Sequence, residues 1–330
     1  MKIISKTLKI LPLLLLVVGL QSCSNDDDNN TEPQPMNIVE TAVATSDLSN
    51  LVAALKAADG NLVSVLNGQG PFTVLAPTNA AFQKFLTDNG FAKLSDVPTD
   101  VLSQILLNHV IAGNVKSTDL VNAGSGYANT NATGPGDKNL SLYFNTSDGV
   151  KFNGVSKVAA ADISATNGTI HVVDAVIGLP TVVDFALANP ALSSLVAALQ
   201  SADSQDPSPN LIPTLSANGP FTVFAPTNDA FASLLNELDP TGGTTLDDVD
   251  PATVEAILKF HVVSGNVTSD AIPTGSVTTL GGDVTINASN LTITDPNGRV
   301  SNIIPALVDI QAVNGIVHAI DKVVLPEMEQ

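Results

Sequence analysis

The hydrophobic positions of this chain follow a helical spacing in some stretches and alternate with polar positions in others. Residues 48–55 and 102–109 carry apolar side chains three or four positions apart, as an amphipathic helix does. Residues 72–76 form a short apolar run between Gly-Pro and Pro, which predicts a strand. From residue 140 to residue 173, several short segments alternate in the manner of half-buried strands.

The same succession of patterns returns about 150 residues later. The segment Gly70–Phe82 matches Gly219–Phe231 at 11 of 13 positions. The four histidines of the chain fall into matched pairs in the same way: His109 with His261, and His171 with His318. This period is the size of a domain and is too long for the units of a solenoid. We therefore expect two tandem domains, residues 37–180 and 181–326.

In each half the helical patterns come first and the strand patterns later, an order typical of α+β proteins. The turn residues at 295–298, Asp-Pro-Asn-Gly, predict a hairpin in the second half. Ser46 or Asp47 is the expected N-cap of the helix at 48–55. Thr78 or Asn79 is expected to cap the helix that follows the strand at 72–76, and Thr227 or Asn228 does so in the second half.

The first 22 residues have the composition of a signal peptide. Three lysines precede an apolar run at 10–20, which is shorter than the roughly 20 residues that cross a bilayer as a helix. The tetrapeptide that ends in Cys23, Leu-Gln-Ser-Cys, resembles a bacterial lipobox, in which the cysteine is lipidated and becomes the mature N-terminus. A lone cysteine forms no internal disulfide. We expect a signal peptide over residues 1–22 and a lipid anchor on Cys23; an ordinary secretory signal with an incidental cysteine is the alternative.

Residues 23–36 are expected to form an acidic, disordered tether, because they offer almost nothing apolar to bury. The acidic residues 26–28, so close to Cys23, resemble the surface-export signal of lipoproteins in Bacteroidetes-type bacteria. The resemblance implies a lipid-anchored outer-membrane protein exposed at the cell surface. A plain solvated spacer is the alternative.

Charge narrows the choice of partners. Loss of residues 1–22 removes 3 of the 13 basic residues and none of the 32 acidic ones, so the mature protein has 10 against 32, a net charge near −22. Such a charge repels nucleic acid and anionic lipid, which argues against both as partners. Contact with a membrane is therefore expected through the lipid anchor alone.

Three boxes, repeated in order, resemble the fasciclin (FAS1) domain family: Thr-Val-x-Ala-Pro-Thr-Asn, the histidine region at 109 and 261, and Asn-Gly-x-x-His-x-x-Asp before Leu-Pro. The resemblance implies two tandem domains, each an antiparallel β-wedge with several packed helices. It also implies a role in adhesion or in contact with extracellular matrix. The family usually carries Tyr before the histidine of the middle box, where this chain has Asn108 and Phe260. In animal relatives that region is linked to integrin binding. Since this chain lacks the tyrosine, we do not expect it to bind integrins.

Catalysis by the histidines is not expected. Asp174 follows His171 by three residues, which places the two side chains on opposite faces of a strand. A Gly-x-Ser-x-Gly elbow and the His-Glu-x-x-His zinc motif are both absent from the sequence. We expect no cofactor and no metal site. The structural interpretation is that His109, His171, His261 and His318 bond backbone groups of neighbouring segments.

The candidate adhesive residues are Asp162, Ile163, Asp309 and Ile310, which match an Asp-Ile element that family members use as an adhesive epitope. The alternative is a strand end with one polar and one core residue. The function we expect is that of a non-enzymatic surface protein that adheres to an extracellular protein, matrix or polysaccharide. A carbohydrate-binding module is the first alternative, weakened because Trp is absent and only two Tyr are present. A hydrolase is the last alternative.

Overall fold

The computed structural model describes residues 34–327, and the chain from Pro35 onward forms one compact unit. The predicted signal peptide, the lipidation of Cys23 and most of the acidic tether lie outside the described residues. In the part of the chain that is described, no single helix has the length and hydrophobicity needed to cross a membrane.

The first domain begins with helices and ends with strands. Its helices are α1 (Ile38–Ala44), α2 (Ser49–Ala57), α3 (Leu62–Asn67), α4 (Asn79–Asp88), α5 (Thr99–Leu107) and α6 (Ser117–Ala123). Its strands are β1 (Phe72–Pro77), β2 (Val110–Ala112), β3 (Ser125–Thr133), β4 (Asn139–Asn145), β5 (Lys151–Phe152), β6 (Ser156–Ala165) and β7 (Gly168–Val173). Short 3₁₀ turns, η1 to η3, lie at Ser46–Leu48, Leu94–Asp96 and Pro135–Asp137.

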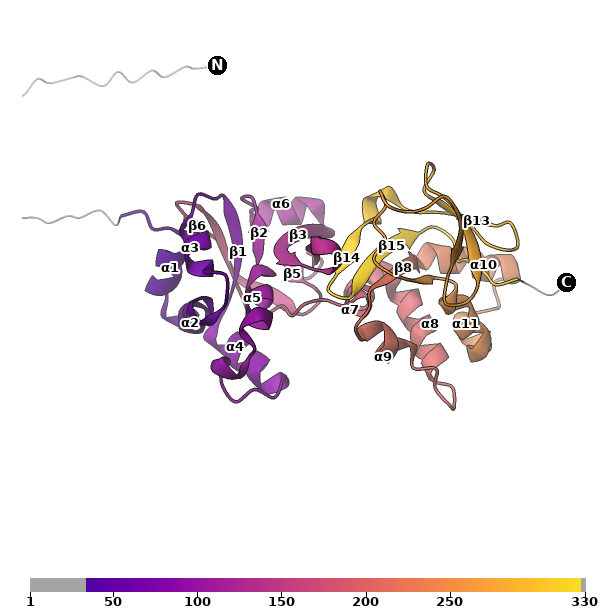
Figure 1. The fold of residues 1–330 in the computed structure, drawn as a ribbon, viewed down its shortest axis with the longest axis horizontal. Helices are drawn as coiled ribbons and strands as arrows, with labels where there is room; N and C mark the ends of the chain where they lie inside the picture. Colours follow the sequence, from indigo (N-terminus) through magenta and orange to yellow (C-terminus); the bar gives the residue numbers. More distant parts are fainter. Residues whose placement is uncertain (1–33, 328–330) are drawn as a thin grey trace, which may run out of the picture. The chain divides into compact units, whose positions relative to one another are not determined.

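The second domain repeats this order. Its helices are α7 (Val182–Ala188), α8 (Ser193–Asp203), α9 (Leu211–Ser216), α10 (Asn228–Leu238) and α11 (Pro251–Lys259). Its strands are β8 (Phe221–Pro226), β9 (Val262–Ser264), β10 (Gly275–Thr278), β11 (Asp283–Asn287), β12 (Thr292–Thr294), β13 (Val300–Asn302), β14 (Ile310–Ala312) and β15 (Gly315–Ile320). The 3₁₀ turns η4 to η6 are Pro190–Leu192, Leu246–Asp248 and Pro305–Leu307. Figure 1 draws the first domain in colours from indigo to magenta and the second in colours from salmon to yellow.

The strands of the first domain close into a barrel in the order β1 to β7, and those of the second form two four-stranded sheets. The predicted hairpin at 295–298 joins β12 to β13, which pair antiparallel. Most neighbouring strands pair antiparallel, as expected, but one pair of strands in each domain is parallel. Strand β1 pairs parallel with β7, and β8 pairs parallel with β15. Parallel pairing needs a long connection between the strands, and nearly a whole domain of chain separates each pair.

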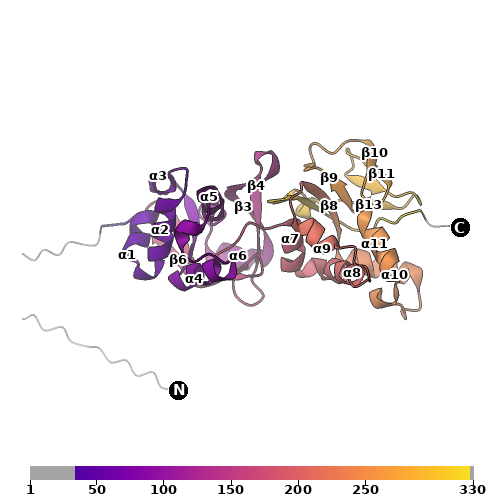
Figure 2. The ribbon, with the colours of Figure 1, turned by 60° about the horizontal axis from the view of Figure 1, so that its bottom comes forward.

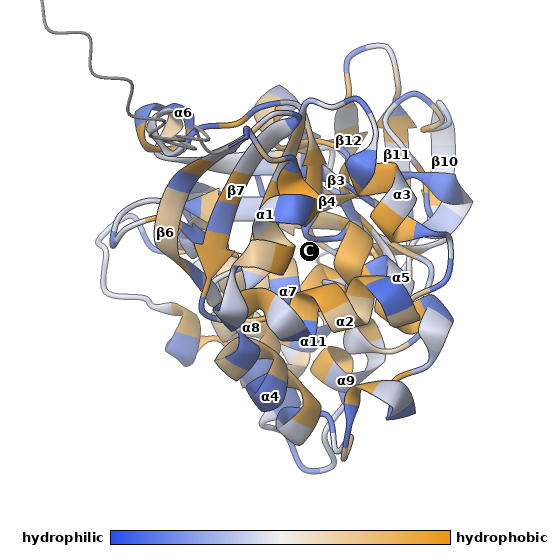
Figure 3. Cartoon of the chain, turned by 90° about the vertical axis from the view of Figure 1, so that its left-hand side faces the viewer, coloured by the Kyte–Doolittle hydropathy of each residue, from blue (hydrophilic) through white to orange (hydrophobic). Residues whose placement is uncertain are grey.

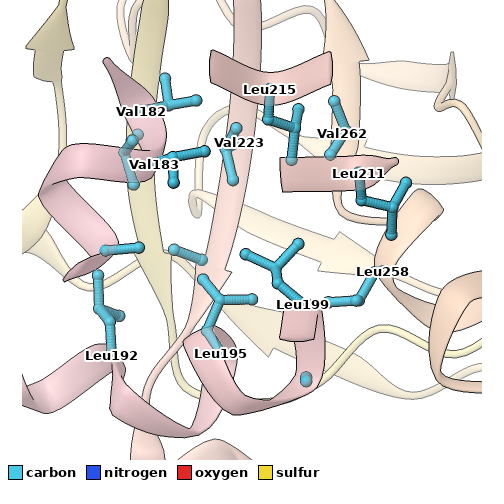
Figure 4. Close-up of a cluster of buried hydrophobic side chains, with 14 of the residues drawn as sticks. Val182, Val183, Leu192, Leu195, Leu199, Leu211, Leu215, Val223, Leu258 and Val262 are labelled. Atoms are coloured by element: carbon cyan, nitrogen blue, oxygen red, sulfur yellow. The ribbon is translucent and has the colours of Figure 1, made fainter. Parts of the chain in front are cut away.

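The helices of each domain cover one side of its central strands. In Figures 1 and 2, helices α8, α9 and α11 lie together on one side of β8 and β9. Apolar and hydrophilic positions alternate along such helices as α4 and α5, as the colours of Figure 3 show. Figure 4 shows the core that results in the second domain, where α7, α8, α9 and α11 meet the two strands. The labelled side chains there include Val183, Leu199, Leu215 and Val223, all of them buried.

One hairpin differs between the two domains. From Val110 in β2 to Phe144 in β4 the first domain uses 34 positions, whereas the second uses 24 from Val262 to its counterpart Ile286. The ten extra residues lengthen the β3–β4 hairpin and include η3. The hairpin extends to β14 of the second domain, beside which it is drawn in Figure 1.

This long hairpin joins the two domains. The backbone N–H of Gln311 in β14 donates to Ser141 Oγ in β4 at 3.0 Å. The ring of Tyr127 lies 5.1 Å from that of Tyr143 and 5.7 Å from that of Phe185 in α7, measured between centroids. Tyr143 is buried in the same hydrophobic cluster as the core of the second domain. The two domains therefore share part of one core.

Candidate functional site

His171 and His318 lie at matched places in β7 and β15, and both are fully buried. The N–H of Asp162 donates to Nδ1 of His171 at 3.2 Å, so the ring proton is on Nε2, which donates to the carbonyl of Val115 at 3.0 Å. His318 repeats the arrangement with the N–H of Asp309 and the carbonyl of Val267. Each ring therefore joins two backbone segments.

His109 and His261 join a different pair of segments. The N–H of Ile177 donates to Nε2 of His109 at 2.9 Å, and the Nδ1–H of the ring donates to the carbonyl of Ile105 at 2.7 Å. His261 bonds the N–H of Val324 and the carbonyl of Ile257 in the same way. Burial lowers the pKa of both His109 and His261 to about 4. Both rings are therefore neutral at physiological pH.

These contacts leave the histidines little capacity for chemistry. In each of the four rings, one nitrogen donates to a backbone carbonyl and the other accepts from a backbone N–H. Asp174 and Asp321, which follow the second histidines in sequence, instead accept from the N–H groups of Lys157 and Asn302 at 2.7 Å. Within the described residues, no three His, Cys, Asp or Glu side chains gather as a metal site would require. The histidines are structural in this geometry.

Thr78 and Asn79 support two different helices. Thr78 Oγ1 accepts from the N–H of Ala81 and caps α4. Asn79 Oδ1 accepts from the N–H of Asn50 at 2.8 Å, so it caps α2, a helix 29 residues earlier. The expectation that Ser46 or Asp47 caps this helix is wrong, because both residues belong to the turn η1. Thr227 and Asn228 act alike, capping α10 and α8.

The Asn-Gly pair of the last box also has a structural explanation. Asn167 Nδ2 donates to the carbonyls of Leu66 and Gly68 at the end of α3, and its Oδ1 accepts from Ile38 at the start of α1. The next residue, Gly168, has to be a glycine, because a Cβ at this position would lie 1.9 Å from the carbonyl oxygen of Phe72. The residue lets β7 approach β1 closely enough to pair.

Asp162 and Asp309 have the left-handed backbone conformation, with φ of 59° and 57°. The Asp162 carboxylate accepts from both the N–H and the hydroxyl of Ser117, at the start of α6. The hydroxyl bond is the main cause that holds the pKa of Asp162 below its usual value. Asp309 binds Ser269 in the same manner, at 2.7 and 2.5 Å.

The isoleucines of these two elements have different surroundings. Ile163 is half-buried beside the first domain's core, and Ile310 is buried in the shared core. Adhesion through the two Asp-Ile elements stays a prediction. The features that sequence reasoning missed are the domain-joining hairpin and the caps that Asn79 and Asn228 provide across helices. Ten residues present in one half of the repeat and absent from the other were the available signal for the hairpin.

Comparison with known proteins agrees with the repeated fold. The family model described as Fasciclin domain matches residues 46–180 and 190–326. The chain therefore belongs to the fasciclin domain family, with two domains in tandem. It is 36% identical to protein sll1483 of Synechocystis sp. over 179 residues, which cover 53% of this chain and 90% of that one.

Two further proteins are similar to this chain. The chain is 30% identical to human periostin over 267 residues, which cover 79% of this chain and 29% of periostin. Among solved structures, a FAS1 domain pair from the insect cell adhesion molecule Fasciclin I matches with a TM-score of 0.49 at 20% identity. That match covers 86% of this chain and 97% of the other.

Proposed function

We propose that this protein is a non-enzymatic, lipid-anchored surface protein that adheres to an extracellular protein or matrix component. Membership of the fasciclin domain family is the observation that carries this proposal, because the domain also occurs in the insect cell adhesion molecule Fasciclin I. The commitment of all four histidines to backbone groups supports the non-enzymatic part.

The adhesive elements are proposed to be the backbone around Asp162, at a register shift within β6, and around Asp309, just before β14. Each is held in a left-handed turn by its serine partner, so it offers a preorganised rather than a flexible contact. The low pKa of Asp162 keeps its carboxylate charged at neutral pH. A partner with a basic patch would complement both this charge and the acidity of the whole chain.

The test is binding of the full chain to a panel of immobilised extracellular proteins, with Asp162→Asn and Asp309→Asn as variants. Asparagine retains an oxygen that accepts from Ser117 or Ser269, but it carries no charge. We expect the variants to keep their melting temperature and to bind the partner more weakly. Unchanged binding by the doubly substituted protein would remove these elements from the adhesive site.

The proposed anchor is a lipid on Cys23, supported by the lipobox-like sequence before it. Two or more acyl chains make a lasting membrane anchor, since each buried CH₂ contributes about 0.8 kcal/mol. Exposure at the outer face of the outer membrane is part of the proposal, and residues 26–28 support it. Protease added to intact cells tests the orientation, because an inward-facing protein would survive the treatment.

A further inference from the structure

A polar pocket lies at the end of the first domain where β1 and β7 begin. Its volume is about 620 Å³, and none of its eleven lining residues has a charged side chain. In a chain with 32 acidic residues, such a neutral lining points to an uncharged ligand. Five of the lining residues carry side-chain amides: Asn37, Asn67, Gln69, Asn114 and Asn167.

The second domain has the matching pocket, but there the first domain partly fills it. This pocket measures about 220 Å³, and Pro135 of the long hairpin is one of its lining residues. Asn266, the counterpart of Asn114, donates from Nδ2 to the carbonyl oxygen of Pro135 at 3.3 Å. The same Nδ2 group donates to Gln311 Oε1 at 3.1 Å, and Asn266 Oδ1 accepts from Gln311 Nε2 at 3.0 Å. In the second domain the Nδ2 group at this place therefore bonds two neutral carbonyl oxygens, and that of Pro135 has an apolar ring next to it.

Asn114 is oriented to make the same kind of contact with a ligand. The buried hydroxyl of Thr169 accepts from Lys116 Nζ at 2.7 Å, so its own proton is directed to Asn114 Oδ1 at 2.5 Å. This bond fixes which way the amide faces. The Nδ2 group of Asn114 makes no hydrogen bond within the described residues, so it is available to a ligand in the pocket.

Two further amides have unused hydrogen-bonding capacity. Asn67 and Gln69 are exposed and, within residues 34–327, their side chains make no hydrogen bond. Each amide offers two donor hydrogens and a carbonyl acceptor. Asn167 differs, because both ends of its amide already bond α1 and α3. The ligand contacts are thus assigned to Asn67, Gln69 and Asn114.

We propose that this pocket binds a neutral oligosaccharide that carries N-acetyl groups. An acetamido group presents a carbonyl oxygen beside a methyl group, as Pro135 presents its carbonyl beside a ring, and sugar hydroxyls both donate and accept bonds from amides. An extended peptide suits the pocket less well. Peptides commonly add to a free strand edge, whereas β7 is paired on both sides, with β1 and β6.

This site is separate from the proposed adhesion to protein, and the two fail in distinguishable ways. The experiment is calorimetric titration of the full chain with a chito-oligosaccharide, and with a cello-oligosaccharide that lacks the N-acetyl groups. The variant is the double substitution Gln69→Ala and Asn114→Ala. Asn218→Ala is the matched control, because Asn218 is the exposed counterpart of Gln69 in the second domain.

We expect saturable binding of the N-acetylated sugar, weaker binding of the other, and no change with salt because no charged group takes part. Loss of two hydrogen-bonding side chains is expected to weaken binding by about tenfold or more. The control should bind as wild type does. The double variant should stay folded with a somewhat lower melting temperature, because Asn114→Ala leaves the buried Thr169 hydroxyl without its acceptor. Absence of binding to the N-acetylated sugar, or equal binding by wild type and the double variant, would overturn the proposal. Protein adhesion by the double variant should be intact.

Discussion

Acidification from pH 7 to pH 5 is expected to destabilise this protein through its buried histidines. His109 and His261 have pKa values of about 4 in the folded protein, against 6.5 when unfolded. The unfolded chain therefore takes up protons below pH 6.5, while the folded chain refuses them until about pH 4. The stability from these two groups is full above pH 6.5, falls as the pH falls, and is lost below pH 4.

The size of the effect follows from the two pKa values. Each histidine should remove about 2 kcal/mol from the free energy of unfolding between pH 7 and pH 5. Burial also lowers the pKa of His318, which adds to the loss in the same direction. Carboxylates contribute little in this window because their ordinary pKa values lie near 4.

The assay is equilibrium unfolding in urea at pH 7 and at pH 5, for wild type and for His109→Gln and His261→Gln. Glutamine does not titrate, so each variant should lose one share of the pH dependence even where it is less stable at pH 7. That comparison separates the histidines from any general effect of the chain's negative charge. A pH dependence equal to that of wild type in both variants would refute the assignment of neutral, buried rings.

Packing in the core of the second domain and lipidation of Cys23 can each be tested by substitution. Val182→Ile should raise the stability of the second domain by about 0.5–1.5 kcal/mol. The cavity beside Val182 is about 40 Å³, whereas the matching cavity beside Ile38, its counterpart in the first domain, is about 10 Å³. A lower melting temperature would mean that the added methyl group does not fit. Phe185→Ala should cost about 3–5 kcal/mol and, by loosening the shared core, should turn one calorimetric transition into two; two transitions already in wild type would contradict the shared core. Cys23→Ser should move the protein out of the detergent phase, and continued partitioning would refute the lipid anchor.

Local structure could be predicted wherever a short pattern determines it. The strand at 72–76 and the turn at 295–298 follow from residues adjacent in sequence, and both are present. The parallel pairing of β1 with β7 could not be read in this way, because their register depends on contacts between segments almost 100 residues apart. The cap that Asn79 provides to α2 was missed for the same reason.

In the candidate site, too, the features that depend on a local pattern could be predicted, and those that depend on contacts between domains could not. The repeated histidines were expected to bond backbone groups, and each has the partners that this requires. The roles of Tyr127 and Tyr143 were not foreseen, since a count of aromatic residues does not reveal that two of them meet Phe185 across a domain boundary. The polar pocket depends on which of two matching faces another domain covers, and no local pattern carries that information.

The most direct test of the proposed function is a combined binding and turnover assay on the full chain and on His171→Gln. Adhesion is measured on immobilised extracellular proteins, turnover on a broad panel of ester and glycoside substrates, and folding by calorimetry. We expect saturable adhesion by wild type, no turnover, and a lower melting temperature for His171→Gln, because loss of the ring leaves the partly buried carbonyl of Val115 without its donor. Turnover by wild type that disappears in His171→Gln at an unchanged melting temperature would contradict the proposal that the protein is not an enzyme.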